Sequence, residues 1–190
     1  MSAHTLRAVA ERATSRLGQA ASRLTENSRW LLLSLVVVAV DQWSKALVEV
    51  HLPLYAAHPL APGWLNLTHI RNTGVAFGLL SGRNSSLGLA VLGLIALVLV
   101  VVYFAFTHTR DRWLLAALSL VLGGAVGNLM DRIMSGAVTD FLDVYVGPSH
   151  WPSFNVADSA ITVGIALLAF DVLRTRDSAP QREPEGAEEP

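Results

Sequence analysis

Long apolar runs dominate the chain and predict its main elements. Residues 87–106 carry no charge, and residues 113–130 carry none either. A helix of about 20 apolar residues spans the roughly 30 Å hydrocarbon core of a bilayer. Two further runs, residues 30–50 and 156–173, are apolar apart from a few charged side chains. The pattern therefore predicts four transmembrane helices.

Basic residues are concentrated in the segments that lie on one side of these predicted spans. These segments are residues 1–29, 107–113 and 174–176. The segments on the other side, residues 51–86 and 133–155, together hold only two arginines and no lysine. Short basic segments stay in the cytoplasm. Both termini are therefore expected to be cytoplasmic, and residues 51–86 and 133–155 extracytoplasmic.

The first extracytoplasmic segment contains a short alternating pattern. In "GWLNLTHI", residues 63–70, leucines alternate with polar side chains, which is typical of a strand. The following "NTGVAFG", residues 72–78, supplies two glycines for a bend. We expect a small β element on the outer membrane surface. The predicted fold is an all-α polytopic membrane protein with four transmembrane helices and this small extracytoplasmic β element.

Composition agrees with a membrane domain. Of the 190 residues, 52% are apolar and 15% are charged, against about 25% charged in soluble domains. The absence of cysteine excludes disulfides, Cys-ligated zinc and a thiol nucleophile. The first apolar run starts late and lacks a small-residue cleavage site, so no cleaved signal peptide is expected. One membrane domain, residues 30–173, is predicted.

The two ends of the chain differ in charge. Residues 1–29 hold five arginines and two glutamates, a net charge of +3. Their apolar side chains recur at helical spacing, which leaves two alternatives, an interfacial helix and a disordered tail. The last residues, "SAPQREPEGAEEP", are acidic and rich in proline, so residues 174–190 are predicted to be a disordered acidic tail.

Several polar residues lie inside the predicted spans. Asp41 and Lys45 are four residues apart and share a helix face, so they form either an ion pair or part of a site. Asn128, Asp131 and Arg132 can all face the bundle interior, as a functional site or as a polar clasp between helices.

Glycines in the third span point to close helix packing. Gly123 and Gly127 have the small-xxx-small spacing that lets two helices approach each other. This prediction concerns the packing of the bundle and not its chemistry.

Three acids fall at the outer ends of the third and fourth spans. Asp140 and Asp143, taken alone, are surface-loop acids. Asn155 and Asp158 have the spacing of a helix cap, with Asn155 at the N-cap and a carboxylate in the first turn. Asp140 and Asp158 are expected at the same membrane surface.

Five short motifs give these residues a common meaning. They occur in the order seen in the lipoprotein signal peptidase family, also called signal peptidase II, and the resemblance covers about residues 30–173. The motifs that carry the resemblance are "DQWSK" (41–45), "RNTGVAFG" (71–78), "GNLMDR" (127–132), "VTDF" (138–141) and "FNVADS" (154–159). Each is weak alone, but five in the family order with four predicted spans are specific. The N-terminal extension and the acidic tail lie outside the resemblance.

The resemblance implies an aspartic endopeptidase of the bacterial cytoplasmic membrane, with no cofactor or metal. Asp140 and Asp158 match the catalytic pair. The substrate would be a diacylglyceryl-modified prolipoprotein, cut just before the lipidated cysteine at the extracytoplasmic interface. Membrane lipids are the other expected partner; nucleic acid is not, and a monomer is expected. Residues matching or supporting the site are Asp41, Lys45, Arg71, Asn72, Asn128, Asp131, Arg132 and Asn155.

The chemistry of two close carboxylates fits this activity. Both cannot ionise easily, so one keeps its proton. The ionised member acts as general base on a water, and the protonated member polarises the scissile carbonyl and helps to protonate the leaving amine. Arg71, Asn72 and Arg132 would orient the peptide or hold the carboxylates, and an apolar groove would take the lipid chains and signal helix.

Other functions fit the sequence less well. Ser44 and Lys45 are adjacent in a helix and diverge by about 100°, so they do not form a serine–lysine dyad. The H-E-x-x-H pattern of a metalloprotease is absent from the sequence. A small transporter or channel, with Asp41, Lys45 and Asp131 as an ion path, is the alternative from another class, and a purely structural membrane protein is the remaining one.

Overall fold

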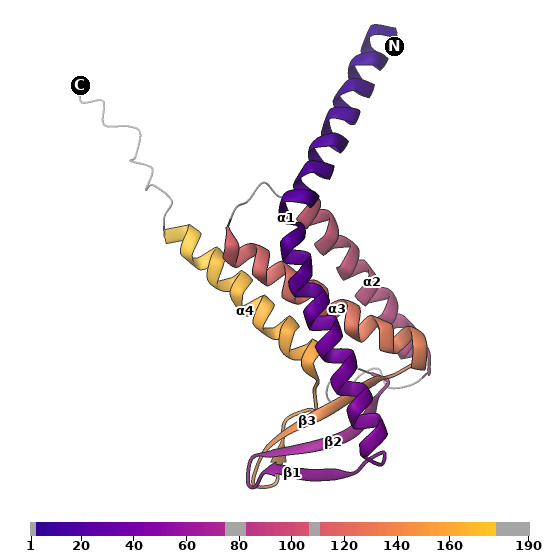
Figure 1. The fold of residues 1–190 in the computed structure, drawn as a ribbon, viewed down its shortest axis with the longest axis vertical. Coiled ribbons are helices and arrows are strands. Elements are labelled where there is room, and N and C mark those ends of the chain that lie inside the picture. Colours follow the sequence, from indigo (N-terminus) through magenta and orange to yellow (C-terminus); the bar gives the residue numbers. More distant parts are fainter. Residues whose placement is uncertain (1–2, 75–82, 107–110, 178–190) are drawn as a thin grey trace, which may run out of the picture.

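A computed structural model describes residues 3–74, 83–106 and 111–177 of the chain (Figure 1). Four helices, α1 (Ala3–His51), α2 (Arg83–Phe106), α3 (Arg112–Ser135) and α4 (Val156–Asp177), form a bundle with a small sheet at one end. The start of α1 and the end of α4 lie at the other end. The predicted bend in "NTGVAFG" lies largely outside the described residues.

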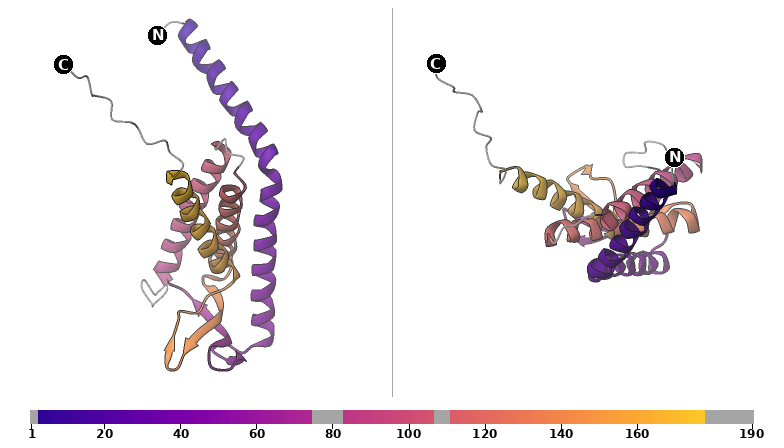
Figure 2. Two further views of the ribbon diagram at one scale, coloured as in Figure 1. Left: turned by 90° about the vertical axis from the view of Figure 1, so that its left-hand side faces the viewer. Right: turned by 90° about the horizontal axis from the view of Figure 1, so that it is seen from above.

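Helix α1 is longer than the first predicted span. It begins at Ala3, so the N-terminal segment is helical and continuous with the apolar run that follows. Figure 2 shows this N-terminal part extending beyond the other helices. Its position on a membrane surface stays a prediction.

Three helical stretches of the described residues are long and apolar enough to cross a bilayer, namely Arg29–His51, Arg112–Ser135 and Val156–Arg174. The apolar helix Gly88–Phe104 within α2 is shorter. Leucines, isoleucines and valines stand exposed on the outer faces of α1, α2 and α4. Exposed apolar side chains at this density suit contact with lipid.

Helix α3 is the centre of the bundle. It packs against each of the other three helices, whereas no Cα atom of α2 lies within 8 Å of one of α4 among the described residues. Asp111 caps its start by accepting a hydrogen bond from the Trp113 N–H at 2.8 Å. Gly136 ends it in the left-handed conformation, with φ of 74°, which a glycine adopts without strain. The chain then turns directly into the sheet.

The sheet is antiparallel, in the order β1-β2-β3-β4. Strand β2 (Leu65–Asn72) confirms the strand predicted from "GWLNLTHI", and it pairs with β1 (Ala57–Ala61), which was not predicted. Strands β3 (Val138–Val146) and β4 (Ser149–His150) come from the connection before α4, for which no strand was predicted. The β element is therefore built from both extracytoplasmic segments of the prediction, and β2 lies beside β3.

Candidate active site

Asp140 lies in β3, opposite Ile70 of β2, and its side chain is almost fully buried, with 2% exposed. The interpretation of this residue as a loop acid is wrong. The Asn72 and Asn155 side-chain amides donate to its two oxygens, at 2.9 and 2.8 Å. Burial raises the pKa of the Asp140 carboxyl to about 7; the charge of Asp158 acts in the same direction and the two amides oppose it.

Asp158 lies in the first turn of α4, where the predicted cap is confirmed. Asn155 Oδ1 accepts a hydrogen bond from the Asp158 N–H at 2.9 Å, and Asp158 Oδ2 accepts one from the Asn155 N–H at 3.2 Å. This is a reciprocal capping arrangement. The Asn128 side chain donates to Asp158 Oδ1 at 2.7 Å. Asn155 therefore contacts both carboxylates.

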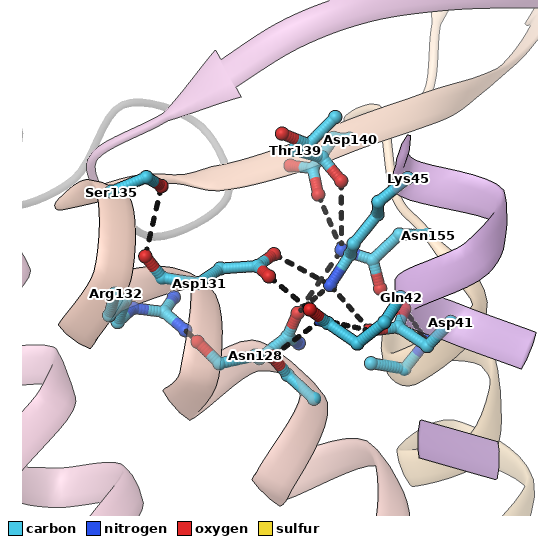
Figure 3. Close-up of polar contacts among 12 residues, drawn as sticks. Asp41, Gln42, Lys45, Asn128, Asp131, Arg132, Ser135, Thr139, Asp140 and Asn155 are labelled. Atoms are coloured by element: carbon cyan, nitrogen blue, oxygen red, sulfur yellow. Dashed lines mark hydrogen bonds and ion pairs between the residues drawn. The ribbon is translucent and has the colours of Figure 1, made fainter. Parts of the chain in front are cut away.

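A buried ion network lies between α1 and α3 (Figure 3). The Lys45 ammonium is 2.7 Å from Asp41 and 2.8 Å from Asp131, and it donates to Asn128 Oδ1 at 3.0 Å. The Gln42 amide donates to Asp131 at 2.8 Å and to Asp41 at 3.2 Å. Lys45 and Asp41 thus form an ion pair, one of the two alternatives that their spacing allowed, and Lys45 also contacts a residue that binds Asp158.

Small residues bring the helices close enough for these contacts. A Cβ atom added at Gly123 would lie 2.8 Å from the Ser34 carbonyl oxygen, and one at Gly127 would lie 2.5 Å from Asp41 Oδ2. The predicted close packing is confirmed, with α1 as the partner of α3. Asp41 also reaches α4, where it accepts a hydrogen bond from the Ala157 N–H at 2.9 Å.

A cavity of about 650 Å³ opens at the two aspartates. Leu89 of α2 forms part of one wall, and α4 forms another. Its polar end holds both carboxylates and the Arg132 side chain, whose Nε is buried and has no hydrogen-bond partner among the described residues. The lining residues are Asn72, Gly74, Leu89, Arg132, Asp140, Trp151, Pro152, Ser153, Phe154, Asp158, Ser159, Thr162 and Val163.

The arrangement brings together most of the residues predicted for the site. Two carboxylates that share a cavity and a hydrogen-bonding neighbour can act as a general acid and a general base on a water. Asn72 and Arg132 line the same cavity. Arg71 is not among the lining residues; its guanidinium donates instead to the Ser135 carbonyl at 2.7 Å, which holds β2 against the end of α3.

Asp143 is not the solvated loop acid that the sequence suggested. It lies in β3 with 6% of its surface exposed. Its carboxylate accepts a hydrogen bond from the Asn66 amide at 2.9 Å and lies 2.8 Å from His150 Nδ1. It therefore holds the β3–β4 hairpin in place.

Sequence reasoning missed several residues that support the site. Gln42 bridges the two carboxylates of the ion network. Thr139, beside Asp140, donates to Glu49 of α1 at 2.5 Å. Residues 151–154 form one wall of the cavity. The roles of Thr139 and of residues 151–154 could not be inferred without strand β3, because β3 contacts α1 on one side and Phe154 on the other.

Comparison with known proteins identifies related chains. A family model described as signal peptidase (SPase) II matches residues 33–174. The chain is 44% identical to the lipoprotein signal peptidase of Desulforapulum autotrophicum over 149 residues, which covers 76% of this chain and 91% of that protein. It is 46% identical to that of Burkholderia mallei over 147 residues, which covers 76% and 87%.

Solved structures show the same fold. A bacterial membrane enzyme determined by the in meso method at 2.3 Å superposes with a TM-score of 0.74 and 30% identity, covering 83% of this chain and 95% of that one. A second, at 1.9 Å, gives a TM-score of 0.69 and 32% identity, covering 77% and 93%. The residues matched by the family model, 33–174, include both carboxylates, the ion network and the residues that line the cavity.

Proposed function

Because this chain belongs to the signal peptidase II family, we propose that it removes signal peptides from prolipoproteins by an aspartic mechanism that uses Asp140 and Asp158. It is a membrane-embedded protease. The observation that carries the mechanism is that both carboxylates line one cavity and both accept hydrogen bonds from Asn155.

The reaction needs one ionised and one protonated carboxylate. The ionised member removes a proton from a water, which attacks the scissile carbonyl carbon, while the protonated member donates to the carbonyl oxygen. Collapse of the tetrahedral intermediate then returns protons to the leaving amine and to the dyad. The buried Asp140, with a pKa of about 7, suits this division of roles. Asn72 and Arg132 are placed to orient the peptide.

The substrate is a prolipoprotein whose cysteine already carries diacylglycerol, and the cut falls just before that cysteine. Support comes from the cavity, which has a polar end at the carboxylates and apolar side chains such as Leu89 and Val163 further along. Since no Cα atom of α2 lies within 8 Å of one of α4 among the described residues, lipid chains and a signal helix can approach from the bilayer between them.

We further propose four spans with both termini in the cytoplasm and the site at the extracytoplasmic interface. The start of α1 and the end of α4 share one end of the bundle, and the sheet lies at the other (Figure 1). The enzyme acts as a monomer, because α1, α3, α4 and the sheet of one chain supply the proposed site.

The transporter or channel alternative is not favoured. Asp41, Lys45 and Asp131 would have formed its ion path. They are instead paired with one another, and their side chains expose 0%, 4% and 11% of their surface. The family comparisons point to a protease as well.

Single amide substitutions test the mechanism. Asp158→Asn keeps an oxygen for the Asn155 N–H, so a residue that was only a cap should lose at most about 1 kcal/mol of stability. A catalytic carboxylate should lose at least about 10²–10⁴ in rate, since an amide cannot exchange the proton. Asp140→Asn should lose rate by a similar factor. The variant with both substitutions should be scarcely slower than either single variant, because the two carboxylates act as one unit.

The assay is cleavage of a lipidated prolipoprotein by purified enzyme in detergent. Asp171→Asn, at the far end of α4, is the matched control and should stay active; its carboxylate bonds Arg174, away from the cavity. The unlipidated precursor should be cleaved poorly. Near-normal cleavage by either dyad variant would disprove the aspartic mechanism, and equal cleavage of both precursors would disprove lipid recognition.

A further inference from the structure

Lys45 fixes the orientation of a side-chain amide that touches the dyad. An ammonium group has only donors, so the Asn128 atom 3.0 Å from Lys45 Nζ must be the oxygen. The Asn128 NH₂ group is then forced toward Asp158, to which it donates at 2.7 Å. The Asn155 NH₂ group also donates to this oxygen, at 3.2 Å, so Lys45 is the charged one of its two donors.

The amide of Asn155 is fixed in a different way. A backbone N–H can only donate, so the Asn155 atom facing the Asp158 N–H must be the oxygen. The Asn155 NH₂ group therefore faces Asp140 at 2.8 Å and Asn128 Oδ1 at 3.2 Å. Both Asn155 and Lys45 donate to the same Asn128 oxygen, which polarises the Asn128 N–H bonds toward Asp158.

The two carboxylates consequently differ in what surrounds them. Asp158 accepts a polarised amide and a backbone N–H at the start of α4, where the helix dipole favours negative charge. Asp140 lies in a strand and accepts two side-chain amides, from Asn72 and Asn155. Negative charge is better stabilised on Asp158.

We propose that Lys45 is a positioning residue which, by orienting and polarising Asn128, makes Asp158 the ionised general base and leaves the proton on Asp140. This inference rests on the aspartic mechanism proposed above and deepens it by assigning the two roles. Asp158 takes the proton from the attacking water, and Asp140 gives its proton to the carbonyl oxygen. The raised pKa of Asp140, about 7, agrees with this assignment.

Other charged groups near the dyad act in known directions. Arg132, from α3, shares the cavity with both carboxylates and favours ionisation of either. Asp41 and Asp131, from α1 and α3, offset much of the Lys45 charge at long range. Glu49 of α1 accepts a hydrogen bond from the Thr139 hydroxyl, next to Asp140 in β3. The contact that links Lys45 to the dyad is its hydrogen bond to Asn128.

The experiment is a pH–rate profile of purified enzyme acting on a diacylglyceryl-modified prolipoprotein. Lys45→Met removes both the charge and the donor, and Lys45→Gln keeps a donor for Asn128 without the charge. An opposite charge close to a carboxylate is worth about 1–3 pH units. Because Lys45 acts through one amide, we expect the acidic limb of Lys45→Met to move up by about one unit, with a smaller move for Lys45→Gln.

This shift corresponds to about a tenfold loss of kcat below the midpoint that is recovered at higher pH, with KM little changed. Ser34→Ala is the control, because it removes a different buried α1–α3 hydrogen bond, from Ser34 to the Ser119 carbonyl at 2.8 Å. It should lower thermal stability without moving the pH profile. An equal loss at every pH in Lys45→Met, or an unshifted profile, would show that Lys45 is only structural.

Lys45→Met leaves two buried carboxylates without their cation, so it can fail to fold. The double variant Lys45→Met with Asp131→Asn removes one of these charges and should show the same shift. An infrared measurement also tests the assignment without any Lys45 variant. At neutral pH, the signal of a protonated carboxyl group should disappear in Asp140→Asn and persist in Asp158→Asn; the reverse result would overturn the inference.

The two proposals fail differently. If both dyad variants cleave normally, the aspartic mechanism itself is wrong. If the dyad variants are inactive while the Lys45 variants keep the wild-type profile, the mechanism stands and only the role of Lys45 is wrong.

Discussion

Gly127→Ala should damage both the stability and the activity of this enzyme, although it adds one methyl group. The added Cβ would lie 2.5 Å from Asp41 Oδ2 and 3.2 Å from Asp41 Cγ. To reach ordinary contact at 3.4 Å, the oxygen would have to move by about 0.9 Å, the difference between 3.4 and 2.5 Å. Either the Asp41 carboxylate or the whole of α1 must be displaced.

Asp41 has little freedom to give way. Its Oδ2 binds Lys45 at 2.7 Å and Gln42 at 3.2 Å, and its Oδ1 accepts from Ala157 in α4 at 2.9 Å. Overpacking of a tightly packed site costs about 1–3 kcal/mol. For chains of this size each kcal/mol lowers Tm by about 2–4 °C, so a fall of about 2–12 °C is expected. Activity should fall as well, because Lys45 and Asn128 move with Asp41.

The assay is thermal unfolding in detergent together with prolipoprotein cleavage. Gly93→Ala, in α2, is the matched control because nothing lies within 4 Å of its added Cβ. Alanine favours a helix over glycine by about 1 kcal/mol, so this variant should be at least as stable as the wild type. If Gly127→Ala kept the Tm and the activity of the wild type, the tight α1–α3 contact described here would not exist.

Two further predictions concern stability and topology. In Asp140→Asn, the decline in stability that the raised pKa causes between about pH 4 and 7 should disappear. In the wild type, Asp140 ionises at about 3.8 in the unfolded chain and only at about 7 in the folded protein, so its ionisation lowers the free energy of unfolding between these pH values. The difference in free energy of unfolding between the variant and the wild type should therefore rise by up to about 4 kcal/mol in favour of the variant from pH 4 to pH 8. Equal pH slopes of the two proteins in chemical unfolding would contradict this. A reporter active only outside the cytoplasm should work when fused near residue 60 or 147 and fail near 109, and the opposite pattern would refute the orientation.

The helices could be predicted from the sequence because a bilayer imposes a simple rule. Runs of about 20 apolar residues can satisfy their backbone only as helices, and α1, α3 and α4 follow that rule. Local spacing also identified the Asp41–Lys45 pair and the Asn155 cap, since both depend on residues within one helical turn.

Strand β3 escaped prediction for a physical reason. A strand with one buried face alternates apolar and polar residues, but Val138, Thr139, Asp140 and Phe141 are all buried. Asp140 is polar but faces the buried cavity, so it interrupts the alternation of apolar and polar residues that would have revealed the strand. Enrichment in β-branched and aromatic residues along 138–146 was the available signal.

The ion network is difficult to explain by stability alone. A buried ion pair is often no more stabilising than apolar residues of the same size, and α1 and α3 are already joined by Gly123, Gly127 and the Ser34–Ser119 hydrogen bond. Asn128, however, needs a charged donor on its oxygen side if its NH₂ is to be strongly polarised toward Asp158, because its other donor, the Asn155 NH₂ group at 3.2 Å, is neutral. A buried lysine meets that need, and two carboxylates make the lysine tolerable in the bundle. On this argument, Asp41 and Asp131 neutralise Lys45, and Lys45 directs the donor that sets the charge of the dyad.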